Sequence, residues 1–337
     1  IIVVKPNATE TQMKEIIDFV NDKGLKTHIS RGTERTIVGV VGDESIIART
    51  NIALMDGVEK VMPILEPYKL VNKVFKPEGT ILNFDENVSI GGNSIALIAG
   101  PCAIESREQI FDVAKNISKA GAKFLRGGAF KPRTSPYAFQ GLEVLGLQFM
   151  RSAADMYGLK VVSEIVSESD LEKSVEYIDI IQIGARNAQN FRLLREVGKI
   201  NKPVLLKRGI AQTIDEWLGS AEYIMSEGNY RIILCERGIR TFETSTRNTL
   251  DISTIPVLKS KTHLPVIIDP SHAAGHAAYI PALSKGAVAA GADGLIIEVH
   301  PDPKCAVSDA LQQITPAQFS ELTDELRLIA HAIGREI

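Results

Sequence analysis

One pattern recurs along the chain from residue 93 onward. A short apolar run is followed by a polar loop and then by a segment with apolar residues at helical spacing. The short runs are apolar on both faces, as are strands of a parallel sheet that helices cover. The eight expected strands are Ile95–Ala99, Lys123–Arg126, Lys160–Glu164, Asp179–Ile183, Pro203–Lys207, Arg231–Cys235, Pro265–Asp269 and Asp293–Val299.

Eight strand–helix units predict an α/β chain with a closed (β/α)8 TIM barrel. Ser106 and Ser167 stand where two of the helices should begin, and serine is a favoured N-cap. An open, doubly wound sheet is the alternative, but such sheets seldom need eight units. We therefore expect residues 93–337 to form a catalytic barrel with its active site at the carboxyl ends of the strands.

The first 70 residues carry a different pattern. Thr9 can cap a helix that runs to about Asp22. Around it we expect strands at Ile1–Val4, Leu25–Ser30, Thr36–Val41 and Val58–Leu65 and a second helix from about Glu44 to Met55. The order β-α-β-β-α-β is that of a small ferredoxin-like α+β domain. Such a module can bind an effector, form an oligomerisation surface or be a folding appendage.

Between these regions, residues 71–92 should hold a linker and a hairpin. Two prolines and several charges between Glu66 and Gly79 are typical of a linker. Thr80–Phe84 and Asn87–Ile90 flank a polar pair of residues, which predicts a hairpin. We expect this hairpin to close the lower end of the barrel.

Composition narrows the class of protein. The 337 residues suffice for a barrel of about 250 residues and a small module. A net charge of −3 argues against nucleic-acid binding, which depends on a basic excess. Cys102, Cys235 and Cys305 are too few and too irregularly spaced for a disulfide framework, so we expect a cytoplasmic location. No apolar run approaches the roughly 18 residues of a membrane span, and the first residues do not resemble a signal peptide.

Basic side chains gather at the expected strand ends. Because these ends meet at one mouth of a barrel, the cations would repel one another unless an anion neutralised them. Arginine binds phosphate and carboxylate bidentately, so a ligand with both groups would fit. The residues are Arg126, Lys131, Arg186, Lys207 and Arg237.

A second set of strand-end residues can bind a metal. Cys102, His272, Glu298 and Asp309 follow expected strands one, seven and eight, and strands one and eight are neighbours in a closed barrel. Singly, a cysteine is more often a small buried apolar residue. Together, a thiolate, an imidazole and two carboxylates suit one divalent transition metal, Mn, Fe, Co or Zn, better than Mg or Ca.

The other cysteine and histidine side chains are given lesser roles. Cys235 is expected to pack in the interior or line the site. His263 and His331 are expected at the surface or on helices. His276 and His300 lie near the mouth and could support the metal ligands from outside.

Seven segments of the barrel region carry specific motifs. They are Ala99–Cys102, Leu125–Gly141, Ile183–Arg186, Leu206–Gly209, Cys235–Gly238, Asp269–His272 and Glu298–His300. Together they resemble the 3-deoxy-D-arabino-heptulosonate 7-phosphate (DAHP) synthase family, which opens the shikimate pathway. The related 3-deoxy-D-manno-octulosonate 8-phosphate synthases share the barrel but typically have an asparagine-containing segment where this chain has residues 131–135. This segment favours erythrose 4-phosphate over arabinose 5-phosphate as the substrate.

The resemblance implies a condensation of phosphoenolpyruvate with erythrose 4-phosphate that uses one divalent metal, with Mn as the first choice. Lys131 would protonate the aldehyde oxygen, and Glu164 would assist the water that adds to C2 of phosphoenolpyruvate. Cys102 and His272 would take part in catalysis by binding the metal. One departure is at Ala273–His276, where relatives often place arginine after the glycine. The implied binding residues are Cys102, His272, Glu298 and Asp309 for the metal, Arg126, Lys131, Ala185, Arg186, Lys207 and Arg237 for phosphoenolpyruvate, and Arg133, Thr134 and Ser135 for the aldose phosphate.

The first 70 residues resemble the ferredoxin-like extension of some family members. This implies inhibition by tyrosine or phenylalanine, with His28 and Ser30 in the effector site. A chorismate mutase extension is helical and does not fit, and we expect a homotetramer without nucleic-acid or membrane partners. The alternatives for the barrel are a regulator without activity and an aldolase with a Schiff base at Lys207.

Overall fold

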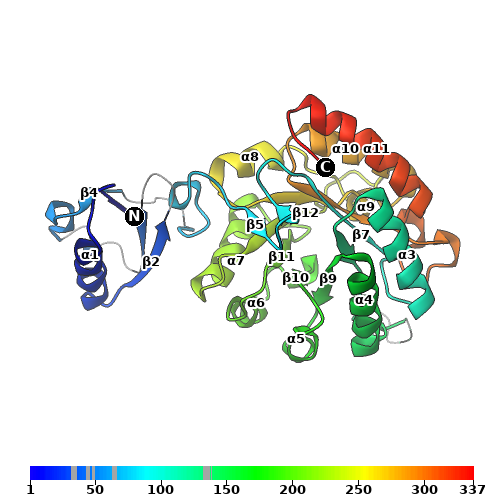
Figure 1. Ribbon diagram of the computed structural model, residues 1–337, viewed down its shortest axis with the longest axis horizontal. Helices are drawn as coiled ribbons and strands as arrows, with labels where there is room; N and C mark the ends of the chain where they lie inside the picture. Colours follow the sequence, from blue (N-terminus) through cyan, green and yellow to red (C-terminus); the bar gives the residue numbers. More distant parts are fainter. Residues whose placement is uncertain (32–35, 43–45, 48–49, 63–66, 132–136, 138) are drawn as a thin grey trace. The chain divides into compact units, whose positions relative to one another are not determined.

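The protein is described by a computed structural model of residues 1–337, except for residues 32–35, 43–45, 48–49, 63–66, 132–136 and 138 (Figure 1). It forms two compact units. Residues 1–79 with 261–263 make the first unit, and residues 80–260 with 264–337 make the second. Among the helices of the described ranges, none combines the length and apolar character that a membrane crossing needs.

The second unit is a closed barrel of parallel strands in the order β10-β11-β12-β13-β14-β7-β8-β9, which confirms the predicted fold. All eight expected strands are present, and each of their ends differs from expectation by at most one residue. The strands are β7 (Ala96–Gly100), β8 (Phe124–Arg126), β9 (Lys160–Ile165), β10 (Ile180–Ile183), β11 (Val204–Lys207), β12 (Ile232–Glu236), β13 (Val266–Ile268) and β14 (Gly294–Glu298).

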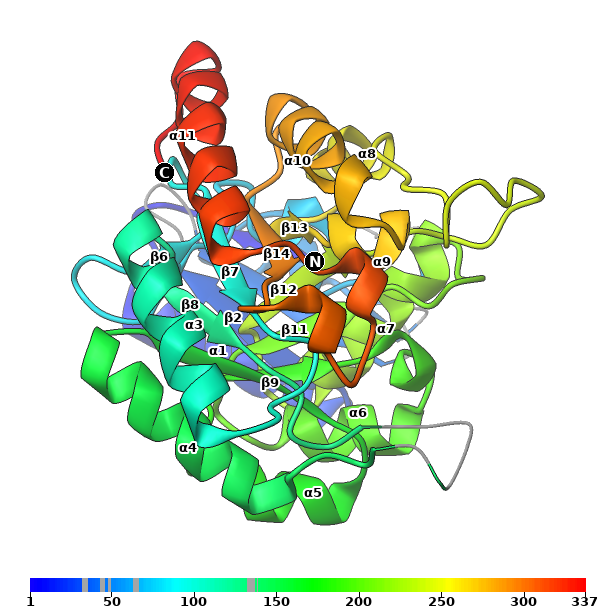
Figure 2. The same ribbon diagram turned by 90° about the vertical axis from the view of Figure 1, so that its right-hand side faces the viewer.

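Helices surround these strands, as Figure 2 shows. The side chains of Ser106 and Ser167 accept hydrogen bonds from the first turns of α3 and α5, so the expected caps are present. The helices are α3 (Arg107–Ala120), α4 (Glu143–Tyr157), α5 (Glu168–Ser174), α6 (Phe191–Gly198), α7 (Ile214–Ser226), α8 (Thr254–Lys261), α9 (Pro270–Ala274), α10 (Ile280–Ala289) and α11 (Pro316–Ala332).

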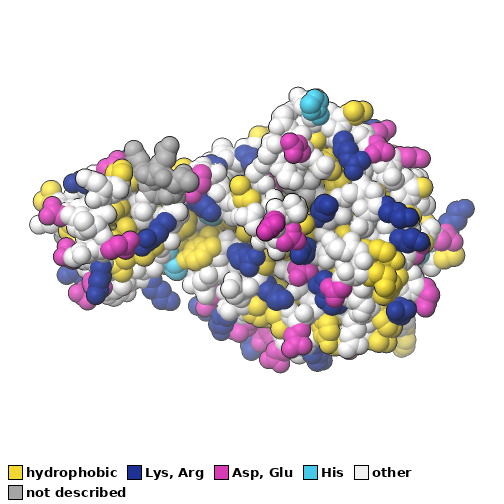
Figure 3. All heavy atoms as spheres, viewed as in Figure 1, with side chains coloured by type: hydrophobic (Ala, Val, Ile, Leu, Met, Phe, Trp, Pro, Cys, Tyr) yellow, Lys and Arg dark blue, Asp and Glu magenta, His cyan; other side chains and the backbone are white. Residues whose placement is uncertain are grey.

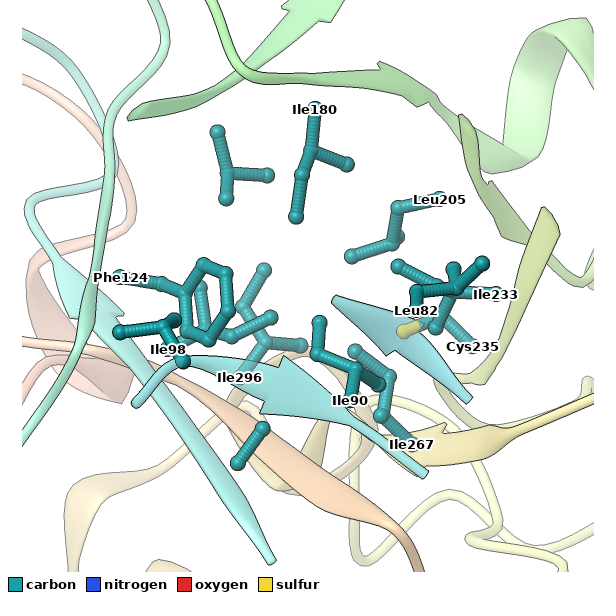
Figure 4. Packing of buried hydrophobic residues seen from close by; sticks show 13 residues of the cluster. Leu82, Ile90, Ile98, Phe124, Ile180, Leu205, Ile233, Cys235, Ile267 and Ile296 are labelled. Atoms are coloured by element: carbon teal, nitrogen blue, oxygen red, sulfur yellow. The ribbon is translucent and has the colours of Figure 1, made fainter. Parts of the chain in front are cut away.

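A hairpin of β5 (Leu82–Asn83) and β6 (Ser89–Ile90) packs into one end of the barrel. Leu82 and Ile90 share an apolar cluster with Phe124 and Ile180, which are the first residues of their strands (Figure 4). The hairpin therefore closes the end opposite the carboxyl ends of the strands. Cys235 belongs to the same cluster, so this thiol packs in the interior.

The first unit contains an antiparallel sheet in the order β2-β3-β1-β4. This is the strand order of the predicted ferredoxin-like arrangement. Met13, Ile16 and Val20 of α1 pack on the sheet, and Thr9 caps this helix as expected. Of the expected second helix, residues 46–47 are helical and residues 52–54 form the short helix η1; the remainder falls partly outside the described residues. The elements are β1 (Ile2–Val4), α1 (Glu10–Asp22), β2 (Lys26–Arg31), β3 (Thr36–Val41) and β4 (Val58–Val61).

The prediction for one histidine of the first unit was wrong. His263 is buried rather than exposed, and its Nε2 lies 2.8 Å from the carbonyl oxygen of Leu70. Its ring centroid is 6.0 Å from that of Phe75. Burial lowers the pKa of His263 to about 4. His331 is exposed on α11, as expected.

Candidate active site

The carboxyl ends of the barrel strands enclose a cavity of about 400 Å³. It receives side chains from both of the sets that the sequence placed at strand ends. The predicted site residues that line it are Lys131, Glu164, Ala185, Arg186, Lys207, Arg237, His272 and Asp309. On the face of the barrel seen in Figure 3, basic and acidic side chains are interspersed.

Three of the four predicted metal ligands form a compact group. The Sγ of Cys102 and carboxylate oxygens of Glu298 and Asp309 all lie within 4.8 Å of one another. The fourth residue, His272 on α9, has its Nε2 3.5 Å from Oε1 of Glu298. We call these four residues the metal half of the mouth.

Asp269 orients the histidine of the metal half. Its Oδ2 lies 2.7 Å from Nδ1 of His272, and its Oδ1 accepts a hydrogen bond from the backbone N–H of the same residue. This directs Nε2 toward Glu298, which is the arrangement that outer carboxylates give to metal-binding histidines. Burial lowers the pKa of His272, which favours the neutral imidazole that binds metals.

The thiol of the metal half is buried beside acidic groups. Sγ of Cys102 lies 3.2 Å from Oγ of Ser308 and 3.3 Å from Oδ2 of Asp309. Burial, together with the charge of Glu298, raises the pKa of Cys102 to about 12. A thiolate at this place therefore needs a cation beside it. Since the sulfur and the two carboxylates lie within 4.8 Å of one another and the imidazole adjoins Glu298, the residues fit a divalent transition metal.

The predicted cations, which we call the anion half, are Arg126, Lys131, Arg186, Lys207 and Arg237. Two of them form buried ion pairs with the protein itself. Nη1 of Arg126 donates to Oε1 of Glu298 at 2.6 Å, and Nζ of Lys207 donates to Oδ2 of Asp269 at 2.5 Å. Glu298 and Asp269 thus reduce the repulsion among the cations of the anion half. A bound anion has less positive charge to neutralise than the sequence implied.

The same ion pairs join the two halves. Burial opposes the ionisation of Glu298, but His272 and Arg126 outweigh it and lower the pKa of Glu298 to about 2. Burial likewise opposes ionisation of Asp269, whose pKa is held well below its usual range by His272 and Lys207. Each of these carboxylates therefore contacts one residue of the metal half and one of the anion half.

Some guanidinium atoms of the anion half are buried without a hydrogen-bond partner among the described residues. They are Nη1 of Arg237 and Nε of Arg126. Burial lowers the pKa of Arg237, so no neighbouring carboxylate fully compensates its charge. Buried donors of this kind call for an acceptor from outside the chain.

Lys131 of the anion half contacts the metal half directly. Its Nζ donates to the carbonyl oxygen of Cys102 at 2.8 Å and lies 3.2 Å from Sγ of the same residue. Glycine at position 128 makes this approach possible, because a Cβ there would meet that Nζ at 2.8 Å. The ammonium group is thus held over the metal half while its side chain lines the cavity.

Glu164 lines the cavity from β9, which β8 separates from β7 in the barrel. Its Oε2 accepts a hydrogen bond from Nε2 of Gln182 at 3.4 Å. A Cβ at Gly184 would lie 2.0 Å from its Oε1. The glycine therefore leaves room for the carboxylate next to Ala185 and Arg186, which form the short helix η3 (Ala185–Asn187).

Comparison with known proteins assigns this arrangement to a family. A sequence profile of the DAHP synthetase I family matches residues 28–332. The chain belongs to the DAHP synthetase I family. It is 50% identical over 337 residues to a phospho-2-dehydro-3-deoxyheptonate aldolase of Thermotoga maritima, covering 100% of this chain and 99% of the relative.

More distant relatives and solved structures agree with this family. A 2-dehydro-3-deoxyphosphooctonate aldolase of Syntrophotalea carbinolica is 32% identical over 265 residues, covering 72% of this chain and 94% of the relative. A crystal structure of the Thermotoga maritima DAHP synthase superposes with a TM-score of 0.79 at 49% identity, covering 99% of this chain and 98% of that one. A truncated form of that enzyme has a TM-score of 0.74 at 50% identity and covers 79% of this chain and 98% of its own.

Three site residues that the family resemblance implies cannot be located. Arg133, Thr134 and Ser135, expected to bind the aldose phosphate, lie outside the described residues. His28 and Ser30, expected in the effector site, lie on β2 of the other unit, opposite Gly39 and Ile37 of β3.

The cavity also contains residues that the strand-end reasoning missed. Arg240 and Arg247 line it and belong to the long loop between β12 and α8. Asp269 directly follows β13 and caps α9, but its role became visible only from its contacts with Lys207 and His272. Gln312 is buried behind Glu298 and donates to its Oε2 at 2.7 Å. No spacing rule identifies a glutamine or a loop arginine of this kind.

Two predicted outer partners occupy different places. His300 is buried, and its Nε2 lies 3.3 Å from Oε2 of Glu105. His276 lies in a second, adjoining cavity, where its Nδ1 accepts from the backbone N–H of Ala278. Neither contact reaches a predicted metal ligand directly.

Proposed function

We propose that the chain catalyses the reaction after which its family is named. Phosphoenolpyruvate, erythrose 4-phosphate and water would give 3-deoxy-D-arabino-heptulosonate 7-phosphate and inorganic phosphate. The observation that carries this proposal is the convergence of the metal half and the anion half on one cavity. The full-length likeness to the Thermotoga maritima relative supports it further.

Phosphoenolpyruvate would bind to the anion half. Arg186, Lys207 and Arg237 line the cavity and can pair with its phosphate and carboxylate. The buried Nη1 of Arg237 would gain an acceptor. Arg126 would contribute its Nε while its Nη1 remains on Glu298. The backbone at Ala185 borders the same space.

In the first step, C3 of phosphoenolpyruvate forms a bond to the aldehyde carbon of erythrose 4-phosphate. The aldehyde oxygen takes a proton, for which Lys131 is the candidate donor, because it lines the cavity and its Nζ lies 3.2 Å from Sγ of Cys102. Positive charge develops at C2. The metal, held by Cys102, His272, Glu298 and Asp309, would supply Lewis-acid polarisation of the aldehyde.

In the second step, water adds to C2 and gives up a proton, and Glu164 at the cavity wall is the candidate acceptor. The resulting hemiketal phosphate loses inorganic phosphate by cleavage of its C–O bond. Because the cations of the anion half already hold the phosphate, they also stabilise the charge that develops as it leaves.

The test compares two aldoses under one set of conditions. The full chain with Mn²⁺ and phosphoenolpyruvate is given erythrose 4-phosphate or arabinose 5-phosphate, and phosphate release is measured. Turnover with the four-carbon aldose is expected to exceed that with the five-carbon aldose. The opposite preference would assign the chain to octulosonate synthesis, for which the 32% identical relative is the supporting observation. Absence of phosphate release with both would refute the proposed reaction.

A Schiff-base aldolase is less consistent with the site. The amine of Lys207 is held 2.5 Å from buried Asp269 and is not presented as a nucleophile. Borohydride reduction in the presence of pyruvate checks this, since a covalent adduct on Lys207 would show the alternative to be right. Manganese is our first choice for the metal, with Fe, Co and Zn as the alternatives. Metal analysis of the protein purified without chelator decides among them.

We also propose that the first unit binds tyrosine or phenylalanine as an inhibitor near His28 and Ser30, and that the enzyme is a homotetramer. His28 and Ser30 are two residues apart on β2, so their side chains lie on the same face of the strand. Burial, together with the charge of Lys26, lowers the pKa of His28. Deletion of residues 1–70 should abolish inhibition by both amino acids, whereas retained inhibition would place the effector elsewhere. Light scattering of the full chain measures the assembly.

A further inference from the structure

A chain of hydrogen bonds runs from the loop after β12 to two residues of the metal half. Nη1 of Arg247 donates to Oδ1 of Asp309 at 3.2 Å and to Oε1 of Gln312 at 2.7 Å. Nε2 of Gln312 in turn donates to Oε2 of Glu298 at 2.7 Å. One loop arginine therefore contacts one carboxylate of the metal half directly and the other through a single amide.

The chemistry of the three groups fixes this arrangement. A guanidinium only donates and a carboxylate only accepts, so the amide of Gln312 can satisfy both neighbours in one orientation alone. Gln312 is 2% exposed and Glu298 is 1% exposed, so water does not compete readily for these bonds. Since Arg126 holds the other oxygen of Glu298, both oxygens of that carboxylate are positioned by the protein.

Asp309 needs such support more than an ordinary residue does. Its backbone has φ 50° and ψ 39°, the left-handed region that side chains other than glycine rarely adopt. Its two carboxylate oxygens are engaged separately, with Oδ1 bound by Arg247 and Oδ2 3.3 Å from Sγ of Cys102. The contact with Arg247 keeps the second oxygen directed at the thiol.

We propose that Arg247 and Gln312 act as one brace that sets the positions of Asp309 and Glu298 for the metal. Both are positioning residues, and the inference rests on the metal site of the proposed function. The brace acts by geometry and not by charge, because a cation next to a metal site would by itself weaken metal binding. Removing Arg247 should therefore weaken the metal affinity, opposite to the effect expected from charge alone.

The test titrates Co²⁺ into the metal-free full chain and follows the thiolate-to-cobalt and d–d absorption bands. Arg247→Met and Gln312→Leu are each expected to weaken Co²⁺ binding by about tenfold, the size typical of lost outer partners. Both should also change the d–d bands, which report coordination geometry. Because the two residues belong to one chain of hydrogen bonds, the double variant should bind Co²⁺ about tenfold more weakly than the wild type in total, as each single variant does. Independent effects would instead multiply to a loss of roughly hundredfold.

Two further variants and a folding check by circular dichroism serve as controls. Arg240→Met removes a cation from the same cavity without touching the brace, and its Co²⁺ affinity should stay within about twofold of the wild type. Arg247→Lys should recover part of the loss. The side chain of Arg247 is 40% exposed, so its variants carry the test even if Gln312→Leu does not fold by circular dichroism.

The opposing outcomes are distinct. Unchanged or tighter Co²⁺ binding by Arg247→Met, equal weakening by Arg240→Met, or a hundredfold loss in the double variant would each overturn the brace. Failure of the wild type itself to bind Co²⁺ through Cys102 would overturn the metal site, and the brace with it.

Discussion

The two halves of the mouth both bury charged groups, but they differ in how many of these groups have hydrogen-bond partners within the protein. In the metal half the carboxylate oxygens are already engaged, those of Glu298 by Arg126 and Gln312 and those of Asp309 by Arg247 and Cys102. The anion half keeps buried guanidinium atoms for which the described residues offer no partner. The carboxylates of the metal half are therefore positioned by the protein, whereas part of the anion half would be completed only by the proposed ligand.

Two neighbouring arginines show the difference most directly. Arg208, after β11, donates to Glu236, Asp251 and Thr254 from one nitrogen and to the carbonyl of Gln212 from another. Arg237, after β12, makes one long hydrogen bond of 3.4 Å to the carbonyl of His272. Both are buried, so the number of hydrogen-bond partners, and not exposure, separates the structural cation Arg208 from the proposed binding cation Arg237.

The largest effect is expected from the metal half. Cys102→Ala should abolish stoichiometric metal binding and lower kcat roughly 10³-fold, because metal polarisation is worth several kcal/mol and each 1.36 kcal/mol is tenfold in rate. Metal analysis and steady-state assays of the same sample measure both. Cys235→Ala, which changes a thiol of the interior cluster, is the matched control and should keep its metal. Full activity of Cys102→Ala without metal would contradict the ligand assignment.

The structural cation should matter for stability. Arg208→Met leaves Glu236 and the half-buried Asp251 without their shared partner, and the expected loss is about 3 kcal/mol in the free energy of unfolding. Trp217, the one tryptophan of the chain, lies in α7 with the Arg208 guanidinium 5.9 Å from its ring, so its fluorescence reports unfolding of the barrel. An unchanged urea midpoint would remove the distinction between the two arginines.

The binding cation should show the reverse. Arg237→Met is expected to lower kcat/KM for phosphoenolpyruvate about 100-fold, as hydrogen bonds to charged groups contribute about 1.5 to 3 kcal/mol. Its urea midpoint should stay the same or rise, because a buried charge without a full set of partners is removed. The pair of variants thus forms its own control. A loss of stability in Arg237→Met as large as in Arg208→Met would show that both arginines are structural.

The fold and the placement of the strand-end residues at one mouth could be predicted because they follow local rules. Apolar runs at regular intervals located every barrel strand, and each strand places the residue after it at a common mouth. Cys102, Glu298 and Lys207 were found in this way. This rule places only the residues close to a strand end and says nothing about residues farther along a loop.

The rest depends on contacts that spacing does not encode. Arg126 and Glu298 are 172 residues apart and pair only because β8 and β14 both flank β7. Arg247 stands in the middle of a long loop, and Gln312 is a polar residue in a short helix of the last loop, so neither carries a signal of its own. His263 has no apolar periodicity around it that distinguishes a buried histidine from a surface one.

The smallest effect concerns His263 of the first unit, a buried titratable group with a ring nitrogen beside a backbone carbonyl. The folded-state pKa of His263 is lowered to about 4, below the unfolded value of about 6.5, so stability is fully present above about pH 7 and is lost as the pH falls toward 4. Between about pH 7.5 and about pH 5 this amounts to about 2 kcal/mol. His263→Gln keeps an N–H for the carbonyl of Leu70 and should remove that part of the pH dependence, measured by urea unfolding with circular dichroism at the two pH values. His331→Gln, at an exposed position, should behave as the wild type does. If His263→Gln lost as much stability as the wild type over this range, the acid sensitivity would come from other groups, among them His28 and His272, whose pKa values burial also lowers.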